Sequence, residues 1–310
     1  MTIVSVKELT KRFERKKEEP FTAVDRISFS INAGERVAFI GPNGAGKSTT
    51  LKMLTGLLYP TDGHAEVAGY IPWKQRKKLA YEIGIVFGQR SQLWYHLPVR
   101  DSFDLLSKIY DIPAAVYRER LAHVIEVLQI GALVDQPVKS LSLGQRMRCE
   151  IAASLLHRPK VLFLDEPTIG LDVTAKALLR EHLQDLARTE NTTIMLTSHD
   201  TGDIEAICDR VILINHGRIL LDKPIAALKA DFLSQKIITL VTDDEQPDIA
   251  LEGAVVVARD RHQITLSVNQ TQHAVDKIVA EALKTLKVRD LSIENAPLES
   301  IIRDLYGEKV

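Results

Sequence analysis

The chain has 310 residues, of which 45% are hydrophobic and 26% are charged, a balance typical of soluble globular proteins, and this length favours two domains. No apolar run reaches the roughly 18 residues that a membrane-spanning helix requires, and the short apolar start at residues 1–7 predicts no secretory signal. A formal net charge of −1 provides no global attraction to nucleic acid, so we expect no nucleic-acid partner. The cysteines, Cys149 and Cys208, form no metal-like cluster and predict small buried thiols in a reducing compartment.

The first part of the chain predicts β structure followed by a phosphate-binding loop. Residues 3–31 alternate in polarity as antiparallel strands do, and the apolar run Arg36–Ile40 has the length of a buried strand. The residues that follow match the pattern G-x-x-x-x-G-K-[ST], and a helical pattern begins at Ser48. The loop consists of Gly41, Pro42, Asn43, Gly44, Ala45, Gly46, Lys47, Ser48 and Thr49.

This loop predicts a nucleotide site that includes a magnesium ion. Its glycines allow successive backbone amides to point at an anion on a helix N-terminus. Lys47 adds a positive charge for the β- and γ-phosphates, and Ser48 offers a hydroxyl to Mg²⁺. The alternative interpretation is a glycine-rich turn that binds nothing, and the motifs further along the chain argue against it.

A largely helical insert is expected between Gln89 and Ser142, where apolar residues recur at helical spacing. Near its start, Trp94 and Tyr95 fit either an interface with another protein or burial within the insert. At its end, Ser142 and Gly144 precede a further helical pattern, so this stretch can offer a hydroxyl, free amides and a positive helix end to phosphate. The plain alternative is that Ser142 only caps the helix.

Two later strands deliver polar residues to one edge of the predicted sheet. The apolar run Val161–Leu164 ends in Asp165 and Glu166, which suits a buried parallel strand that carries acids to its carboxyl end. Asp165 is expected to hold Mg²⁺, and Glu166, turned by the following proline, is the candidate base for the attacking water. His199 follows another apolar strand, residues 193–196, at the same edge.

Together these segments resemble the ATP-binding cassette (ABC) ATPases over residues 3–228. Leu141-Ser142-Leu143-Gly144-Gln145 resembles the signature motif of that family. Gly170-Leu171-Asp172 resembles its D-loop, Thr197-Ser198-His199-Asp200 its switch histidine, and Val86-Phe87-Gly88-Gln89 its Q-loop. The order of these motifs makes the resemblance specific.

The resemblance implies that two copies pair head to tail, so that each ATP lies between the phosphate loop of one copy and the signature motif of the other. Ser142, Gly144 and Gln145 would then serve the nucleotide of the partner. Gln89 would orient water or metal and relay the nucleotide state to the helical insert, and His199 would contact the γ-phosphate. The implied cofactors are ATP and Mg²⁺, with Ser48, Gln89 and Asp165 at the metal.

Two positions depart from the family pattern. Leu143 stands where the family more often has glycine, and a positive φ there would cost about 1–3 kcal/mol, so we expect an ordinary backbone angle and an intact site. The aromatic residue that stacks on adenine is Phe13 by its distance from the phosphate loop, although the insertion at residues 14–20 leaves Phe21 as an alternative.

The expected fold is α/β: a P-loop NTPase ABC nucleotide-binding domain at residues 1–228, followed by a small α+β C-terminal domain at residues 229–310. The first has a mostly parallel sheet, an antiparallel β subdomain and a helical subdomain at about residues 90–155. In the second, strands are expected at 237–241, 254–257, 264–268 and 288–293, and helices at 274–286 and 298–306. This extension resembles those of ABC-2 type exporters, and its role is expected to be dimerisation or regulation.

The resulting hypothesis is an ATP-hydrolysing ABC transporter subunit that drives a separate transmembrane permease, with export as the favoured direction. The subunit would form a homodimer in the cytoplasm, peripheral on the inner face of the cell membrane. One alternative is a soluble ABC ATPase that acts on nucleic acid or the ribosome. Another is a regulatory ATP-binding module without turnover, which the presence of both Asp165 and Glu166 disfavours.

Overall fold

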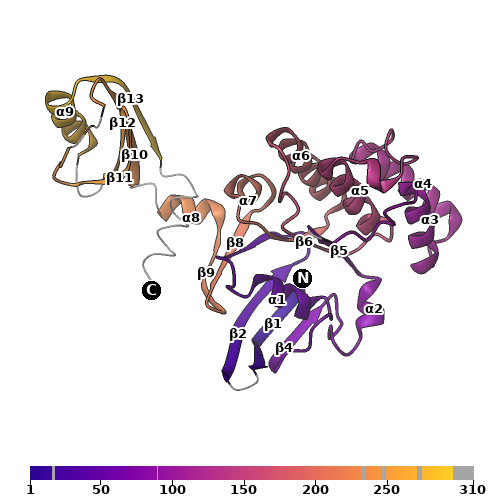
Figure 1. Cartoon of the computed structure of the whole chain (residues 1–310). Helices are drawn as coiled ribbons and strands as arrows, with labels where there is room; N and C mark the ends of the chain where they lie inside the picture. The colour runs from indigo at the N-terminus through magenta and orange to yellow at the C-terminus, as the bar shows by residue number, and fades with distance from the viewer. Residues whose placement is uncertain are drawn as a thin grey trace. The chain divides into compact units, whose positions relative to one another are not determined.

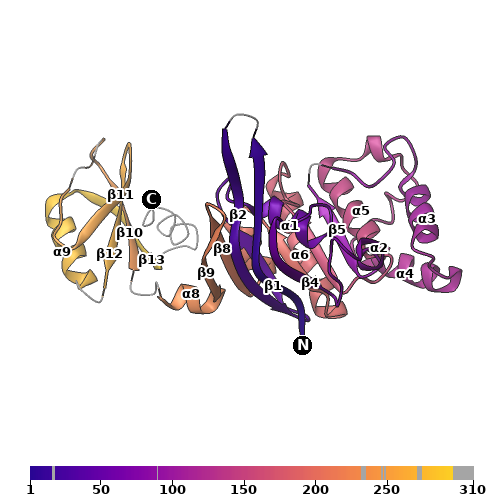
Figure 2. The ribbon, with the colours of Figure 1, turned by 90° about the horizontal axis from the view of Figure 1, so that it is seen from below.

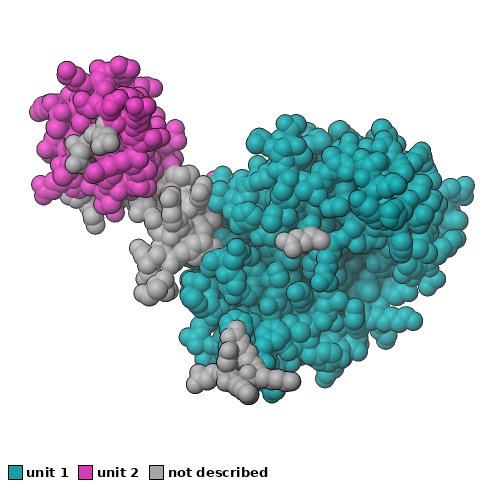
Figure 3. All heavy atoms as spheres, viewed as in Figure 1, with its two compact units in different colours: residues 1–225 teal, residues 226–310 magenta. Residues whose placement is uncertain are grey.

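The structure, a computed structural model, describes residues 1–15, 18–88, 90–231, 235–245, 247, 249–270 and 274–295. It divides into two compact units, residues 1–225 and 226–310, which are coloured separately in Figure 3. The division lies close to the boundary expected after Leu228. The predicted last helix, residues 298–306, lies outside the described residues.

A six-stranded sheet in the order β5-β6-β7-β3-β8-β9 forms the centre of the first unit (Figure 1). Its strands are β3 (Arg36–Ile40), β5 (Ile83–Phe87), β6 (Val161–Asp165), β7 (Thr193–Thr197), β8 (Arg210–Asn215) and β9 (Arg218–Pro224). Neighbouring strands are parallel except for the β8–β9 hairpin at one edge. The continuous apolar sequences of β3, β6 and β7 suit this arrangement, because strands in the middle of a parallel sheet are covered on both faces.

An antiparallel sheet in the order β2-β1-β4 packs against the phosphate-loop helix α1 (Lys47–Leu54). Its strands are β1 (Thr2–Arg15), β2 (Glu18–Asn32) and β4 (Asp62–Val67). One buried cluster joins the two sheets, with the Phe29 ring of β2 at 5.7 Å from the Phe39 ring of β3. The predicted antiparallel β subdomain is therefore continuous with the core of the parallel sheet.

Helices pack around the central sheet, and some of them gather at one end of the first unit. They are α2 (Arg76–Ala80), α3 (Val99–Ile109), α4 (Ala114–Val127), α5 (Leu143–Leu155), α6 (Val173–Glu190) and α7 (Thr201–Ile207), with a 3₁₀ turn at Val138–Ser140. In Figures 1 and 2, α3, α4 and α5 lie together. Helices α3 and α4 both begin directly after a proline, Pro98 and Pro113, which is the N-cap residue in each case and leaves no backbone N–H unpaired at that position. Across the described residues, every helix is too short or too polar to traverse a lipid bilayer.

The second unit has its own hydrophobic core. A four-stranded antiparallel sheet has the order β11-β12-β10-β13, and helix α9 (Val275–Thr285) contributes Ile278 and Ala282 to its core. The strands are β10 (Gln235–Thr242), β11 (Ala254–Asp260), β12 (Gln263–Asn269) and β13 (Val288–Asn295), and α8 (Ile225–Asp231) precedes them. Each predicted strand and the first predicted helix of this region overlap an observed element.

Both cysteines are buried, which gives a direct test of the packing. Burial raises the pKa of the Cys149 thiol to about 12 and also raises the pKa of Cys208. Because the thiolate is the reactive form, we expect neither cysteine to react with Ellman's reagent at pH 8 within minutes in the native protein. Both should react at once in guanidinium chloride. Rapid titration of either thiol without denaturant would contradict the observed packing.

Candidate functional site

The phosphate loop connects β3 to α1 and is held by close backbone contacts on two sides. A Cβ at Gly41 would lie 2.2 Å from the carbonyl oxygen of Ile214, and a Cβ at Gly46 would lie 2.6 Å from that of Ala23. Gly46 also has a φ of 109°, which side chains rarely allow. Strands β2 and β8 therefore confine the loop so closely that only glycine fits at these two positions.

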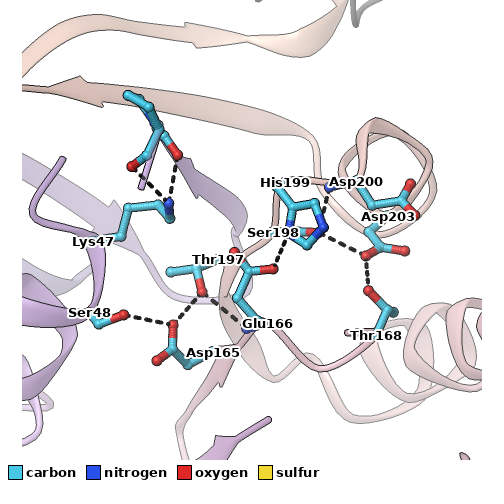
Figure 4. A network of polar contacts seen from close by, with 12 residues as sticks. Lys47, Ser48, Asp165, Glu166, Thr168, Thr197, Ser198, His199, Asp200 and Asp203 are labelled. Carbon is cyan, nitrogen blue, oxygen red and sulfur yellow. Dashed lines mark hydrogen bonds and ion pairs between the residues drawn. The ribbon is translucent and has the colours of Figure 1, made fainter. Parts of the chain in front are cut away.

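Lys47 begins α1 and lies inside the loop that precedes it. Its ammonium group donates hydrogen bonds to the carbonyl oxygens of Gly41 at 2.6 Å and Pro42 at 3.2 Å, and the residue is buried (Figure 4). Burial lowers the pKa of Lys47, whereas the nearby carboxylates of Glu166 and Asp165 raise it. The loop thus holds a cation whose present partners are two backbone carbonyls, which an anionic phosphate can outcompete.

Asp165, at the end of β6, lies between two hydroxyl groups. Thr197, the last residue of the neighbouring strand β7, donates a hydrogen bond to the Asp165 carboxylate at 2.6 Å, and Ser48 of α1 approaches the same oxygen at 3.4 Å. Carboxylate and hydroxyl oxygens are the ligands that Mg²⁺ prefers, and Mg²⁺ usually completes its coordination with substrate phosphates and water. Ser48 and Asp165 therefore fit a magnesium site next to the phosphate loop.

Glu166 directly follows β6 and turns the chain. Its φ of 54° lies in the left-handed region, an unfavourable conformation for a residue with a side chain. The Glu166 amide donates to the backbone oxygen of Thr197 at 3.0 Å and to its hydroxyl at 3.1 Å, and these bonds hold the unusual conformation. The chain thus turns at Glu166, as the proline that follows it led us to expect.

The same turn brings Glu166 to His199. The Nδ1 atom of His199 lies 2.8 Å from the Glu166 carboxylate, and the imidazole is 63% exposed whereas Glu166 is 21% exposed. One ring nitrogen of His199 therefore contacts the Glu166 carboxylate, and much of the ring is accessible to solvent. Figure 4 shows Glu166 and His199 side by side, with Lys47 and Ser48 on one side of the pair and Asp203 on the other.

A buried carboxylate, Asp203 of α7, holds the two loops that carry Glu166 and His199. It accepts hydrogen bonds from the hydroxyls of Thr168, two residues after Glu166, and of Ser198, next to His199. Arg180 of α6 donates to the other Asp203 oxygen at 2.6 Å. The motif around His199 includes Thr197 but assigns it no role of its own, and no local pattern in the sequence marks Asp203.

The signature segment forms the start of α5. The Ser142 hydroxyl accepts a hydrogen bond from the Gln145 amide at 3.2 Å, and the Gln145 side chain accepts one from the Ser142 amide at 2.9 Å. This capping box gives the Ser142 and Gln145 side chains hydrogen-bond partners within the same chain. Leu143 is the first helical residue, with an ordinary backbone angle as expected, and its side chain lies against Gly170.

The two candidate adenine-stacking residues lie opposite each other on β1 and β2. Phe13 pairs with Phe21 across the hairpin, and both rings are partly exposed. The Lys11 ammonium lies 5.1 Å from the centre of the Phe13 ring. Because cross-strand partners share one face of a sheet, the geometry keeps both aromatic residues available to a base.

Gln89 lies outside the described residues. Its neighbour Gly88 does lie at the site, since the Gly88 amide donates to the Asp165 backbone oxygen at 2.8 Å. A Cβ at Gly88 would be 2.4 Å from the Glu166 carbonyl oxygen. The end of β5 is therefore packed against the two acidic residues.

Comparison with known proteins places this chain in a family. A family profile described as ABC transporter matches residues 24–169. The linearmycin resistance ATP-binding protein LnrL of Bacillus subtilis (strain 168) is 30% identical over 92% of this chain and 94% of LnrL. The probable multidrug ABC transporter ATP-binding protein YbhF of Escherichia coli (strain K12) is 32% identical over 82% of this chain, which spans 41% of YbhF.

A solved structure supports the same assignment. The dimeric ATP-binding cassette MJ0796, in a post-hydrolysis state with ADP and Pi bound, matches with a TM-score of 0.64 and 25% identity over 72% of this chain and 98% of MJ0796. The expected α/β fold of P-loop NTPases is thus confirmed. The chain belongs to the family of ABC transporter ATP-binding proteins, which are ATPases.

The Thr197 hydroxyl can be removed without changing the shape of the side chain. We expect Thr197→Val to lower kcat for ATP hydrolysis by about 10-fold, the worth of a hydrogen bond to a charged group, with little change in KM. Steady-state kinetics would measure this. Thr193→Val is the matched control, because the Thr193 hydroxyl accepts a hydrogen bond from the Gly34 amide at the opposite end of β7. Equal losses of kcat in both variants would contradict a positioning role for Thr197.

Proposed function

We propose that this chain hydrolyses ATP as the cytoplasmic subunit of an ABC transporter, and that its dimer drives a separate membrane permease. The single observation that carries the proposal is the convergence of Lys47, the Ser48–Asp165 pair and the Glu166–His199 pair at one edge of the sheet. Family membership supports the transporter role. The names of LnrL and YbhF, which refer to resistance and multidrug transport, favour export.

The residues at this edge divide the chemistry of phosphoryl transfer between them. The phosphate loop, Gly41 to Thr49, binds the β- and γ-phosphates with backbone amides and the Lys47 ammonium. Ser48 and Asp165, with Gln89, would hold Mg²⁺, which neutralises charge on the phosphates when bound. Phe13 or Phe21 would stack on the adenine.

Glu166 is the proposed base. The Glu166 carboxylate orients the attacking water and accepts a proton from that water at an Oε atom. The contacts that Glu166 makes with other residues of the same chain keep the carboxylate in place. His199, bonded to Glu166 through Nδ1, orients that carboxylate and presents its ring to the γ-phosphate. Catalysis by this site is positioning and electrostatic stabilisation, without a covalent intermediate on the protein.

A second copy would complete the site. The exposed N-terminus of α5 presents the Ser142 hydroxyl, the Gly144 amide and Gln145 at a positive helix end, which suits the γ-phosphate held by a partner. The dimeric state of MJ0796 supports this arrangement. Since the phosphate contacts exist only while ATP is intact, hydrolysis would allow the dimer to open.

The proposed contact with the permease lies on the segment before α3. Trp94, Tyr95 and Leu97 are 40%, 54% and 43% exposed. Exposed aromatic residues that lie close together are typical of protein interfaces. Docking there would place the chain on the inner face of the cell membrane.

We expect Glu166→Gln to reduce turnover by about 10²- to 10⁴-fold, the usual contribution of a general base, while ATP binding persists. The variant should therefore accumulate as an ATP-bound dimer, which light scattering after gel filtration would detect. Glu181→Gln, an exposed change on α6, serves as the control and should hydrolyse ATP normally. Near-normal turnover of Glu166→Gln would remove Glu166 from its proposed role.

The transporter assignment is tested by purifying tagged Glu166→Gln protein, with ATP and Mg²⁺, from detergent-solubilised membranes of the source cells. Mass spectrometry should identify a stoichiometric protein with several membrane spans. Replacing both Trp94 and Tyr95 with alanine should reduce its recovery. Isolation only from the soluble fraction, together with ribosomal or DNA-associated proteins, would instead support a soluble ABC ATPase.

A further inference from the structure

Helix α5 carries a buried carboxylate that none of the recognised motifs includes. Glu150 lies about two turns after Ser142 on this helix and is 4% exposed. Burying an ionised carboxylate costs free energy unless hydrogen bonds compensate it, and an apolar side chain would fill the same space at lower cost. The contacts of Glu150 therefore point to its role.

Those contacts reach the segment that follows Gln89. One Glu150 carboxylate oxygen accepts a hydrogen bond from the Ser91 hydroxyl, and the other accepts one from the Gln92 amide at 3.0 Å. The Gln92 side chain donates in turn to the Glu150 backbone oxygen at 2.9 Å. Glu150 thus binds two consecutive residues of this segment with both its side chain and its main chain.

The next residues of the segment are equally well fixed. Leu93 is buried, and its amide donates to the Ser91 hydroxyl at 3.1 Å. The Trp94 amide donates to the hydroxyl of Ser102, a fully buried residue of α3, at 3.1 Å. Residues 91–94 are therefore fastened to α5 at one end and to α3 at the other, while the Trp94 side chain projects toward solvent.

Both carboxylate oxygens of Glu150 accept hydrogen bonds from the segment. Burial raises the pKa of the Glu150 carboxyl above its ordinary value, and the hydrogen bonds from Ser91 and from the Gln92 backbone offset only part of this rise. The carboxylate accepts from both donors at once, whereas an apolar side chain at position 150 would leave the Ser91 hydroxyl and the Gln92 amide without this acceptor.

We propose that Glu150 is a positioning residue that makes residues 91–94 move together with helix α5, so that engagement of Ser142 with a partner's nucleotide shifts the exposed Trp94. This inference rests on the proposed function, because the movement of α5 requires an ATP-bound dimer. The physical link is short: Ser142 and Glu150 share one rigid helix, and Glu150 bonds directly to the segment that carries Trp94.

The test uses Trp94 as its own reporter. The chain has two tryptophans, so Trp73→Phe leaves Trp94 as the single one. In the full chain with Trp73→Phe and Glu166→Gln, ATP with Mg²⁺ should change the Trp94 emission as the dimer forms. Adding Glu150→Ala should leave the ATP-dependent dimer, measured by light scattering, but abolish the change in Trp94 emission. Glu150→Gln, which keeps an acceptor oxygen, should restore part of it.

Control variants separate this role from general stability. Glu126→Ala, an exposed change on α4, should leave the Trp94 response intact. If Glu150→Ala does not fold, Ser91→Ala removes one donor from the exposed end of the link and should weaken the response. A full Trp94 response in the Glu150→Ala or Ser91→Ala dimer would overturn the inference, as would a dimer of the parent protein in which Trp94 does not respond. Failure of the parent to dimerise with ATP would instead contradict the proposed function, and this inference with it.

Discussion

The Thr197 hydroxyl makes the interaction on which the rest of the site depends. It donates to the Asp165 carboxylate and accepts from the Glu166 amide, so one side chain of β7 contacts both the last residue of β6 and the residue that follows it. The bond from the Glu166 amide to this hydroxyl, together with the one to the Thr197 backbone oxygen, stabilises the left-handed backbone that turns Glu166 toward His199. The parallel pairing of β6 with β7 is what brings Thr197 to this position, since Asp165 and Thr197 are register partners.

A buried cation and two carboxylates lie close together at this edge of the sheet. Lys47 is buried with only carbonyl oxygens as hydrogen-bond partners, and two carboxylates lie close by. An anionic phosphate would give the Lys47 ammonium a charged hydrogen-bond acceptor in place of the two carbonyl oxygens. The hydrogen bonds from Thr168 and Ser198 to Asp203 hold the two loops beside this cation in place, which suits a preorganised phosphate site.

Helix α5 joins two surfaces that a transporter subunit would need to connect. Its N-terminus presents Ser142 and Gln145 in a capping box, and two turns later Glu150 holds the segment that carries Trp94. A rigid helix transmits displacement between such points without a long chain of contacts. The second unit has a closed hydrophobic core of its own, and the similarity to LnrL extends over 92% of this chain.

The sequence by itself determined the phosphate loop, the acidic strand, the order of the β and α elements and the strands of the second unit, because each of these is encoded in local pattern or spacing. The contact between Glu166 and His199, the roles of Thr197 and Asp203, and the link from Glu150 to Ser91 were decided only by the tertiary structure. These contacts join residues that are between 5 and 59 positions apart in the sequence. No local pattern marks such pairs, because their geometry arises when neighbouring strands and helices pack and bring polar groups within hydrogen-bonding distance.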